Sequence, residues 1–521
     1  MATITVSNGG TSLKAALAAV QNGDEIVIGT AANQVVTNVG STSLTDRPKA
    51  PGVRQNVTLR GFGDKDNRCT IRNPNHGVVF NMSGMRDFLC KDLIIDSEYN
   101  GNDGTATATG NRNGMVQAFA GDDPVRDIRF EYVQFNQNTN HASAVHGNGN
   151  IQNAQFYRCD WRFSTFGAPG RIYAGETCNT GAAAISMINH QDFDGTGVCD
   201  VTFRECTFRD HGGGVNSTGI GRDHITDGHF IQIDDQQSSG NPSSPIPGLI
   251  RYWIIDCDFD HCGGSAINHN SIYGGQTYII NCSGQNLGRT NLLTETQYQA
   301  GQVQNDRGFL TAFSTATGNP HLITMVNNVA AGRNTGSERM VFYSSASYSV
   351  VGHNNVRYNY PSAGAPAPGG SFYFANQDPG WVDYQIGNDT GDMTPTAGSI
   401  LLGNGVASSV NVPATAGDGL PTFNTASLPH DRVWLGGDYP GIGAIARAGG
   451  VPTETITQTS AVSAAATVYA PSIGQNRITQ SSRITAAATV YAPTIGIFDG
   501  SQLVPNLSVK VLNGDRGVQV L

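Results

Sequence analysis

The stretch Phe203-Arg204-Glu205-Cys206-Thr207-Phe208 carries the pattern that decides the fold: an apolar residue, two variable positions, a cysteine, and an aromatic residue two positions later. Related stretches, with Val, Cys or Asn at the central position, occupy 130–135, 156–161, 254–259, 278–282 and 324–328. From Val133 the steps to Cys159, Cys206, Cys257, Cys282 and Asn327 are 26, 47, 51, 25 and 45 residues. We interpret these steps as one or two multiples of about 24 residues, which indicates a repeat architecture.

A repeat of this length suits one coil of a right-handed parallel β-helix, in which three short strands and their turns stack on the coil below. Equivalent side chains then lie above one another at about 4.8 Å. A small residue such as Cys or Asn at the inward corner of each coil fits such a ladder. We therefore predict an all-β protein, a right-handed parallel β-helix solenoid.

The cysteines have a second interpretation, a set of disulfides. The chain has nine cysteines, an odd number, and all of them fall between Cys69 and Cys282. Thiols stacked on adjacent parallel strands have poor geometry for bridging. We expect mostly buried, reduced thiols.

Composition narrows the class of protein. The 65 glycines suit frequent tight corners, and 14% charged residues is few for a helical globule or a charged disordered chain. The net charge of -10 argues against a nucleic-acid binder, because neutralising phosphate requires clustered Lys and Arg. No apolar stretch approaches the length of a membrane span, so we expect no membrane insertion.

The N-terminal residues predict a strand, a short helix and a second strand. Residues 1–6 alternate like a strand, Thr11 and Ser12 cap an amphipathic helix, and 25–28 resume the sheet. This order, ending in GDEIVI, resembles the opening of pectate-lyase-like right-handed β-helix proteins. The resemblance implies that the helix caps one end of the core. No signal peptide precedes it, so we expect synthesis in a host cytoplasm and release by lysis.

The end of the chain follows a different pattern. Residues 456–474 are repeated as 478–496 with a shift of 22, and each copy holds small β-prone residues and a proline that blocks continued pairing. With so little apolar area, this tail is either a linker or a strand donor that needs another chain. Residues 503–521 alternate again and indicate a hairpin. We predict an N-terminal strand and cap helix at 1–30, the β-helix at 31–448 and a strand-rich tail at 449–521.

The tail units, such as ATVYAPTIG, resemble those on bacteriophage structural proteins. With the leaderless β-helix, this resemblance implies a virion protein: a tailspike, a fibre or a decoration. It implies self-assembly as a homotrimer, attachment to other virion proteins through the tail, and exposure to host surface glycan. Two alternatives remain: a polysaccharide depolymerase of the hydrolase or lyase type, and a bacterial polysaccharide-active enzyme.

In pectate-lyase-like proteins, ligands lie along the strand that follows the Cys-x-aromatic strand. The matching segments here carry an unusual density of titratable groups for so weakly charged a chain. Two carboxylates on adjacent coils would lie about 5 to 10 Å apart, the range that glycoside hydrolases use, with a histidine as acid or base. The predicted catalytic residues are Asp234, Asp235, His229 and His269, and the predicted glycan-binding residues are Trp381, His146, His190, Asp192 and Asn268.

Several of these residues also have a purely structural interpretation. Asp210-His211-x-Gly213-Gly214 recurs as Asp260-His261-x-Gly263-Gly264, two predicted coils later, which favours a repeated corner over a metal site. Trp381, in an irregular loop, is the best candidate for an exposed aromatic contact. We predict no metal and no cofactor. The leading hypothesis is a non-enzymatic virion protein that binds glycan, with catalysis as the alternative.

Overall fold

The computed structural model describes the following residues, and the statements below concern these: 1–41, 47–74, 78–97, 115–119, 125–137, 143–148, 151–162, 183–188, 198–211, 229–235, 249–262, 265–271, 275–287, 308–312, 321–332, 339–343, 345, 347–360, 362–365, 373–375, 377–384, 391–396, 398–401, 443, 509–511 and 518–520. Residues 1–445 and 446–521 form two compact units. Each is described by itself.

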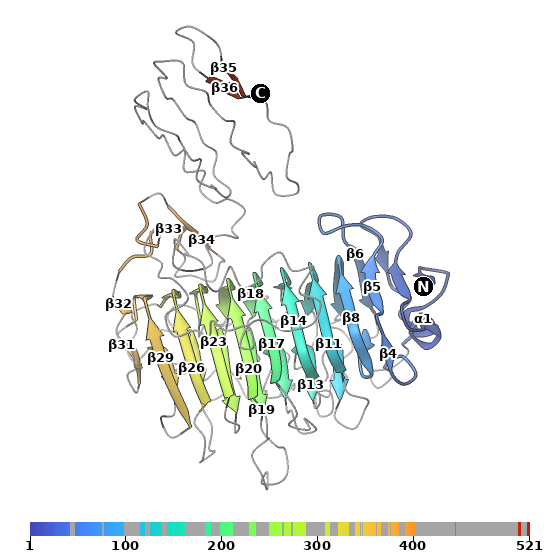
Figure 1. The fold of residues 1–521 in the computed structure, drawn as a ribbon, viewed down its shortest axis with the longest axis horizontal. Coiled ribbons are helices and arrows are strands. Elements are labelled where there is room, and N and C mark those ends of the chain that lie inside the picture. The colour runs from blue at the N-terminus through green and yellow to red at the C-terminus, as the bar shows by residue number, and fades with distance from the viewer. Residues whose placement is uncertain are drawn as a thin grey trace, which may run out of the picture. The chain divides into compact units, whose positions relative to one another are not determined.

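Three parallel sheets build the first unit (Figure 1). The twelve-stranded sheet contains β1 (Thr3–Val6), β2 (Glu25–Ile28), β4 (Arg54–Gln55), β5 (Thr58–Gly61), β8 (Met85–Lys91), β11 (Val125–Glu131), β14 (Ile151–Tyr157), β17 (Val198–Arg204), β20 (Leu249–Ile255), β23 (Gly275–Ile280), β26 (His321–Val326) and β29 (Tyr348–His353). The eleven-stranded sheet contains β3 (Val35–Val36), β6 (Cys69–Asn73), β9 (Leu93–Ser97), β12 (Gln134–Gln137), β15 (Asp160–Arg162), β18 (Thr207–His211), β21 (Asp258–Cys262), β24 (Ser283–Gln285), β27 (Val329–Ala331), β30 (Asn355–Tyr358) and β32 (Tyr373–Ala375). The nine-stranded sheet contains β7 (Phe80–Asn81), β10 (Val116–Phe119), β13 (Ser143–Asn148), β16 (Ala183–Ile188), β19 (Ile231–Asp235), β22 (Ile267–Ser271), β25 (Leu310–Ala312), β28 (Arg339–Tyr343) and β31 (Ser362–Ala365).

From β8 to β31 the chain visits the twelve-, eleven- and nine-stranded sheets in turn. Each strand from β8 to β28 pairs in parallel with the strand three positions further on, as β11 does with β14 and β14 with β17. A chain that returns to the same sheet once per coil is a parallel β-helix, so the predicted architecture is confirmed. The right-handed coil remains a prediction, supported by the strong preference of parallel crossover connections for that hand.

One turn repeats between the twelve- and eleven-stranded sheets. The residue directly after each long strand of the twelve-stranded sheet has a left-handed backbone, with φ between 49° and 54°. The next residue is Cys or Asn in the six later coils, and Leu93 and Val133 in the two earlier ones. The left-handed positions are Asp92, Tyr132, Arg158, Glu205, Asp256, Asn281, Asn327 and Asn354.

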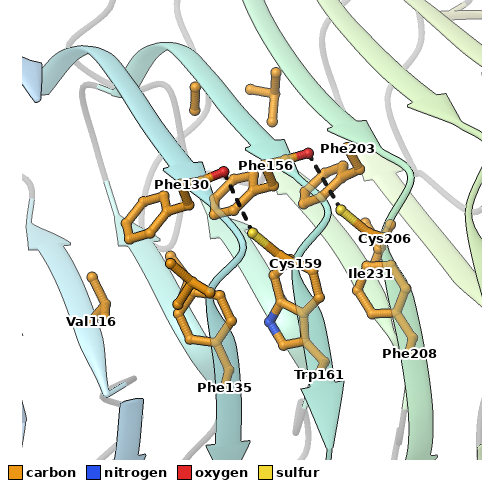
Figure 2. Close-up of a cluster of buried hydrophobic side chains, with 14 of the residues drawn as sticks. Val116, Phe130, Phe135, Phe156, Cys159, Trp161, Phe203, Cys206, Phe208 and Ile231 are labelled. Atoms are coloured by element: carbon orange, nitrogen blue, oxygen red, sulfur yellow. Dashed lines mark hydrogen bonds between the residues drawn. The ribbon is translucent and has the colours of Figure 1, made fainter. Parts of the chain in front are cut away.

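The Cys and Asn side chains after this turn tie each coil to the one before it. Cys159 Sγ donates to the Phe130 carbonyl at 3.5 Å and Cys206 Sγ to the Phe156 carbonyl at 3.3 Å, as Figure 2 shows. In later coils an amide takes the same place, and Asn328 Nδ2 donates to the Ile279 carbonyl at 2.8 Å. The stacked Cys and Asn side chains that the sequence predicts therefore act as hydrogen-bond donors to backbone carbonyls of the preceding coil.

Aromatic stacks fill the interior beside this ladder. Phe130, Phe156 and Phe203 stack face to face with ring centroids about 5 Å apart (Figure 2). Trp161 stacks on Phe208 at 4.5 Å. Strands spaced at about 4.8 Å place identical positions at this separation, so the repeated aromatic residues pack ring on ring.

The predicted number of coils is wrong where the steps are long. β14 pairs directly with β17, β17 with β20 and β23 with β26, so the steps of 47, 51 and about 45 residues are single coils. Register also puts Asn328, one residue after Asn327, in line with Cys282. The additional residues are therefore inserted within single coils.

The repeated Asp-His motif is not a stacked corner two coils apart. β18 pairs directly with β21, and its register places Arg209 opposite Asp260 and His211 opposite Cys262. The two motifs therefore lie in adjacent coils and are displaced by one residue. Asp260 is instead a buried acceptor for Gln285 Nε2 and for the Gly391 amide.

The thiols behave as expected in the described residues. Seven cysteines are free and buried, and burial raises the pKa of Cys90 and of Cys282 well above the ordinary thiol value. The raised pKa keeps the Cys90 and Cys282 thiols protonated at neutral pH, and Cys282 Sγ donates to the Ile254 carbonyl.

The remaining elements complete the two units. Helix α1 (Leu13–Ala19) begins at Ser12, whose Oγ accepts from the Ala15 amide at 3.2 Å, and its apolar face joins the core cluster. β33 (Trp381–Asp383) and β34 (Asp392–Pro395) form an antiparallel pair. In the second unit β35 (Val509–Val511) pairs antiparallel with β36 (Val518–Val520), which confirms the hairpin, whereas the 22-residue repeats lie outside the described residues. No helix among the described residues is long and apolar enough to cross a membrane.

Candidate functional site

Insertions gather around one of the three sheets. From β8 to β30, the connections between the twelve- and eleven-stranded sheets have one or two residues. The long connections of this region all enter or leave the nine-stranded sheet, with 20 residues between β15 and β16 and 13 between β19 and β20, although others, such as that between β13 and β14, have as few as two. Variable loops on a rigid scaffold are where proteins carry binding and catalytic groups. The nine-stranded sheet is therefore the candidate site.

A row of polar residues runs across this sheet in register. On several strands an apolar residue, such as Val145, Ile231 or Ile267, is buried in the core cluster, and the next residue along the strand belongs to the opposite side of the sheet by alternation. Register aligns these alternate positions across seven strands. The polar row consists of Asn81, Gln117, His146, Ser186, Gln232, Asn268 and Thr311.

Two amides of the polar row lack hydrogen-bond partners. Gln117 is fully buried, and neither its Nε2 nor its Oε1 has a partner in the described part of the chain. Gln232 is 9% exposed and its Oε1 is likewise without one. Asn268, the next residue of the row, is half-buried. Buried polar groups are ordinarily satisfied by protein or by ordered water, so these two amides are candidates for a partner other than the described side chains.

The carboxylates at the end of β19 do not form the expected pair across coils. Register places Asp234 between Ile188 and Asn270, and Asp235 beside Ser271. The residues aligned with these two aspartates on the adjacent strands are thus isoleucine, asparagine and serine, and none of them is a carboxylate. The Asp234 and Asp235 side chains lie outside what the structure describes. The catalytic role predicted for them stays a prediction.

Two predicted catalytic histidines are inside the solenoid, and their predicted outward placement is wrong. His269 is fully buried because it shares the inward row of Ile233 and Ala312. Burial and, to a smaller degree, the nearby His321 hold the pKa of His269 well below its usual value. His229 is 1% exposed, and its Nδ1 accepts from the Ser265 amide at 2.9 Å. Neither imidazole faces the outer surface.

Trp381 is also not the exposed contact that the sequence predicts. It is 6% exposed and packs with Val329, Val356 and Leu401 in an apolar cluster on the eleven-stranded sheet. The loop residues around it form the β33–β34 pair, which turns the indole onto the sheet. The predicted exposure of Trp381 is therefore wrong, and its side chain packs in this cluster.

The remaining predicted residues divide into two groups. His146 and Asn268 belong to the polar row by register. His190 and Asp192 lie outside the described residues. Gln117 and Gln232 were not predicted, because the sequence prediction considered only titratable and aromatic side chains and Asn268. The signal in the sequence that marks both residues is an amide between two apolar residues of a strand. Among the described residues, no three His, Cys, Asp or Glu side chains group as metal ligands.

Fold and site together define a parallel β-helix protein with a polar row along its nine-stranded sheet. No protein-family model matches the chain, and no curated protein matches it. Among solved structures it is similar to an alginate lyase from Paenibacillus sp. str. FPU-7, at 11% identity, with a TM-score of 0.25, covering 72% of this chain and 99% of that one. A likeness this low carries no weight for fold or activity, so the architecture stands on the strand pairing.

Proposed function

We propose that the outer face of the nine-stranded sheet binds a polysaccharide chain. The observation that carries this proposal is the polar row, with the unpartnered amides of Gln117 and Gln232 in it. Amide, hydroxyl and imidazole side chains are donors and acceptors for sugar hydroxyls. A row in which each coil adds one such group matches a ligand that is itself a linear repeat.

We propose further that the protein presents this site on a bacteriophage particle as a spike, fibre or decoration that recognises host surface polysaccharide. The support for the particle is the resemblance of the tail repeats at 456–496 to those on phage structural proteins. Homotrimeric assembly and attachment through the tail belong to the same proposal. Light scattering of the full chain tests the assembly, since a trimer has about three times the 54.9 kDa mass of one chain.

The binding site is tested with one substitution in the polar row and a matched control. Gln232→Leu removes an amide on the nine-stranded sheet, and Gln155→Leu removes a buried amide, without a partner at either atom, on the twelve-stranded sheet. Loss of a hydrogen bond to a buried group costs about 1–3 kcal/mol, so we expect Gln232→Leu to weaken glycan binding by about tenfold to a hundredfold. The Gln155→Leu protein should bind as the unaltered protein does.

The measurement is retention on an array of bacterial capsular polysaccharides and lipopolysaccharides, followed by calorimetry with the best ligand. Circular dichroism and thermal melts confirm that both variants fold. Equal binding by the two variants, or no binding of any glycan by the unaltered protein, would remove the nine-stranded sheet as a glycan site.

A second candidate function is depolymerisation of the bound chain, with Asp234 as a catalytic carboxylate. The position of Asp234 favours this second function. Asp234 lies two residues after Gln232 on β19, so the alternation of the strand assigns both residues to the same side of the sheet. The test follows new reducing ends and unsaturated-uronate absorbance with the unaltered protein and Asp234→Asn. Product that disappears in Asp234→Asn while binding persists would establish the enzyme; binding without product would leave a recognition protein.

A further inference from the structure

Cysteines of four successive coils stand one above another inside the solenoid. Each of them directly precedes a strand of the eleven-stranded sheet, and these strands, β15, β18, β21 and β24, pair in that order. All four side chains are free and fully buried. We call them the thiol stack, which consists of Cys159, Cys206, Cys257 and Cys282.

Hydrogen bonds show that the four side chains share one orientation. Each sulfur lies 3.3–3.6 Å from two backbone carbonyl oxygens, one two residues earlier in its own coil and one in the preceding coil. The same two positions serve as acceptors each time, as Figure 2 shows for the preceding-coil acceptors of Cys159 and Cys206. Side chains of the same orientation repeat at the strand spacing, so neighbouring sulfurs lie about 4.8 Å apart.

Two further observations support this spacing. The rings of Phe208 and Phe259, which lie two residues after Cys206 and Cys257, stack with centroids 4.9 Å apart. Burial and, to a smaller degree, a hydrogen bond with the Cys257 thiol raise the pKa of Cys282 well above the ordinary thiol value. Adjacent thiols of the stack therefore contact each other across the coils.

A gap of this size fits a metal ion held by two thiolates in a line. Metal–thiolate bonds are about 2.3 Å long, so two such bonds in line span about 4.6 Å. Soft ions prefer thiolate ligands, and the mercuric ion among them prefers two ligands in a line. Its two positive charges balance those of two thiolates, so the bridge has no net charge, which suits a site without water.

We propose that the thiol stack binds soft divalent ions of linear coordination, with each ion bridging two adjacent coils. Four thiols in a row form two separate pairs of neighbours, so the stack takes two ions. With mercuric chloride, each bridge forms two mercury–sulfur bonds, breaks two S–H and two mercury–chloride bonds, and releases two protons and two chloride ions. A thiol is a weak hydrogen-bond donor, so its carbonyl acceptors lose little when the proton leaves. This site is independent of what the nine-stranded sheet binds.

Binding of this kind stabilises the closed coils. The thiols are fully buried, so an ion enters only when a coil opens locally, and we expect binding to proceed over hours. The closed coils hold each pair of sulfurs at the bridging distance, and an opened coil separates them. The melting temperature should therefore rise when mercuric chloride binds. Zinc chloride should leave it unchanged, because zinc prefers four ligands in a tetrahedron.

Two double variants distinguish a bridged pair from single thiols. Cys159→Ala with Cys206→Ala leaves Cys257 and Cys282, which are neighbours in the stack. Cys206→Ala with Cys282→Ala leaves Cys159 and Cys257, which are two spacings or about 9.6 Å apart. Each variant loses two thiols of the stack and keeps every cysteine outside it, so the two variants differ only in whether the remaining pair is adjacent.

Native mass spectrometry after incubation with mercuric chloride and removal of unbound ion counts the bridges. A bridging ion has lost both chlorides, whereas an ion on a single thiol keeps one. We expect the adjacent-pair variant to hold one bridging ion more than the separated-pair variant, and the unaltered protein to hold two more. Circular dichroism before and after incubation confirms that each protein stays folded.

Three results would overturn the proposal. They are equal numbers of bridging ions in the two double variants, a melting temperature of the unaltered protein that falls on binding, and stabilisation by zinc equal to that by mercury. If a double variant does not fold, X-ray absorption of the unaltered protein with two bound ions decides. The proposal requires two sulfur neighbours at about 2.3 Å from each mercury, and a chloride or a third sulfur in its place would contradict a linear bridge.

Discussion

Asn328 shows how a single side chain joins one coil to its neighbours. Its Nδ2 donates to the Ile279 carbonyl in the preceding coil and to Asn355 Oδ1 in the following one, both at 2.8 Å, and its Oδ1 accepts from the Cys282 amide at 2.9 Å. Cysteine fills this position in the coils before it with one weak sulfur donor. The two residue types are thus alternatives for one task, donating to a backbone carbonyl of the preceding coil.

At this position we expect Asn328→Ala to destabilise the protein more than Cys206→Ala does. The alanine at 328 leaves a buried carbonyl, a buried amide and the Asn355 side chain short of a partner, which should lower the free energy of unfolding by about 2–5 kcal/mol. Cys206→Ala removes a small buried group and a weak donor, at about 1 kcal/mol. Urea denaturation of both variants measures the difference. Equal losses would show that the amide ladder adds nothing beyond packing.

At the scale of one element, the turn between the twelve- and eleven-stranded sheets explains which residues the pattern tolerates. A left-handed backbone is readily adopted by Gly and, among other residues, by Asn and Asp, and it is costly for β-branched ones. Five of the eight left-handed positions are Asn or Asp, and the others are Tyr132, Arg158 and Glu205. Arg158 and Glu205 add an ion pair at 2.6 Å across adjacent coils, so a contact between coils accompanies the less suitable backbone there.

For this turn we expect Asn281→Val to be destabilising and Asn281→Gly to be nearly neutral. Asn281 has φ of 50°, and a β-branched residue there costs about 1–2 kcal/mol, whereas glycine adopts the conformation without strain. Thermal melts of the two variants give the comparison, with the unaltered protein as the reference. A valine variant as stable as the glycine variant would mean that the turn relaxes to another conformation.

At the scale of the whole molecule, stacking converts single positions into a long row. The polar row spans seven paired strands, or six spacings of about 4.8 Å, which is roughly 29 Å. A ligand of one or two sugars meets a small part of this row, and a polymer meets all of it.

If the proposed glycan site is correct, affinity should rise with oligosaccharide length until the ligand reaches about 29 Å and then level off, because each coil adds one contact of similar kind. Calorimetry with a size-fractionated series of the best glycan measures this dependence. An affinity already complete with a monosaccharide would place recognition in a single pocket and contradict binding along the row.

The sequence by itself determined the architecture, because a coil that stacks on itself repeats its chemistry: the Cys-x-aromatic pattern and the N-terminal helix were both visible as local signals. It also indicated the nine-stranded sheet and two members of its row, His146 and Asn268. Only the tertiary structure decided how many coils the long steps contain, since an insertion and an extra coil have the same length in sequence. The tertiary structure also decided that His229, His269 and Trp381 are buried. The side of a sheet on which a side chain lies depends on strand register and on the elements that pack against it, and the residue type alone does not determine either.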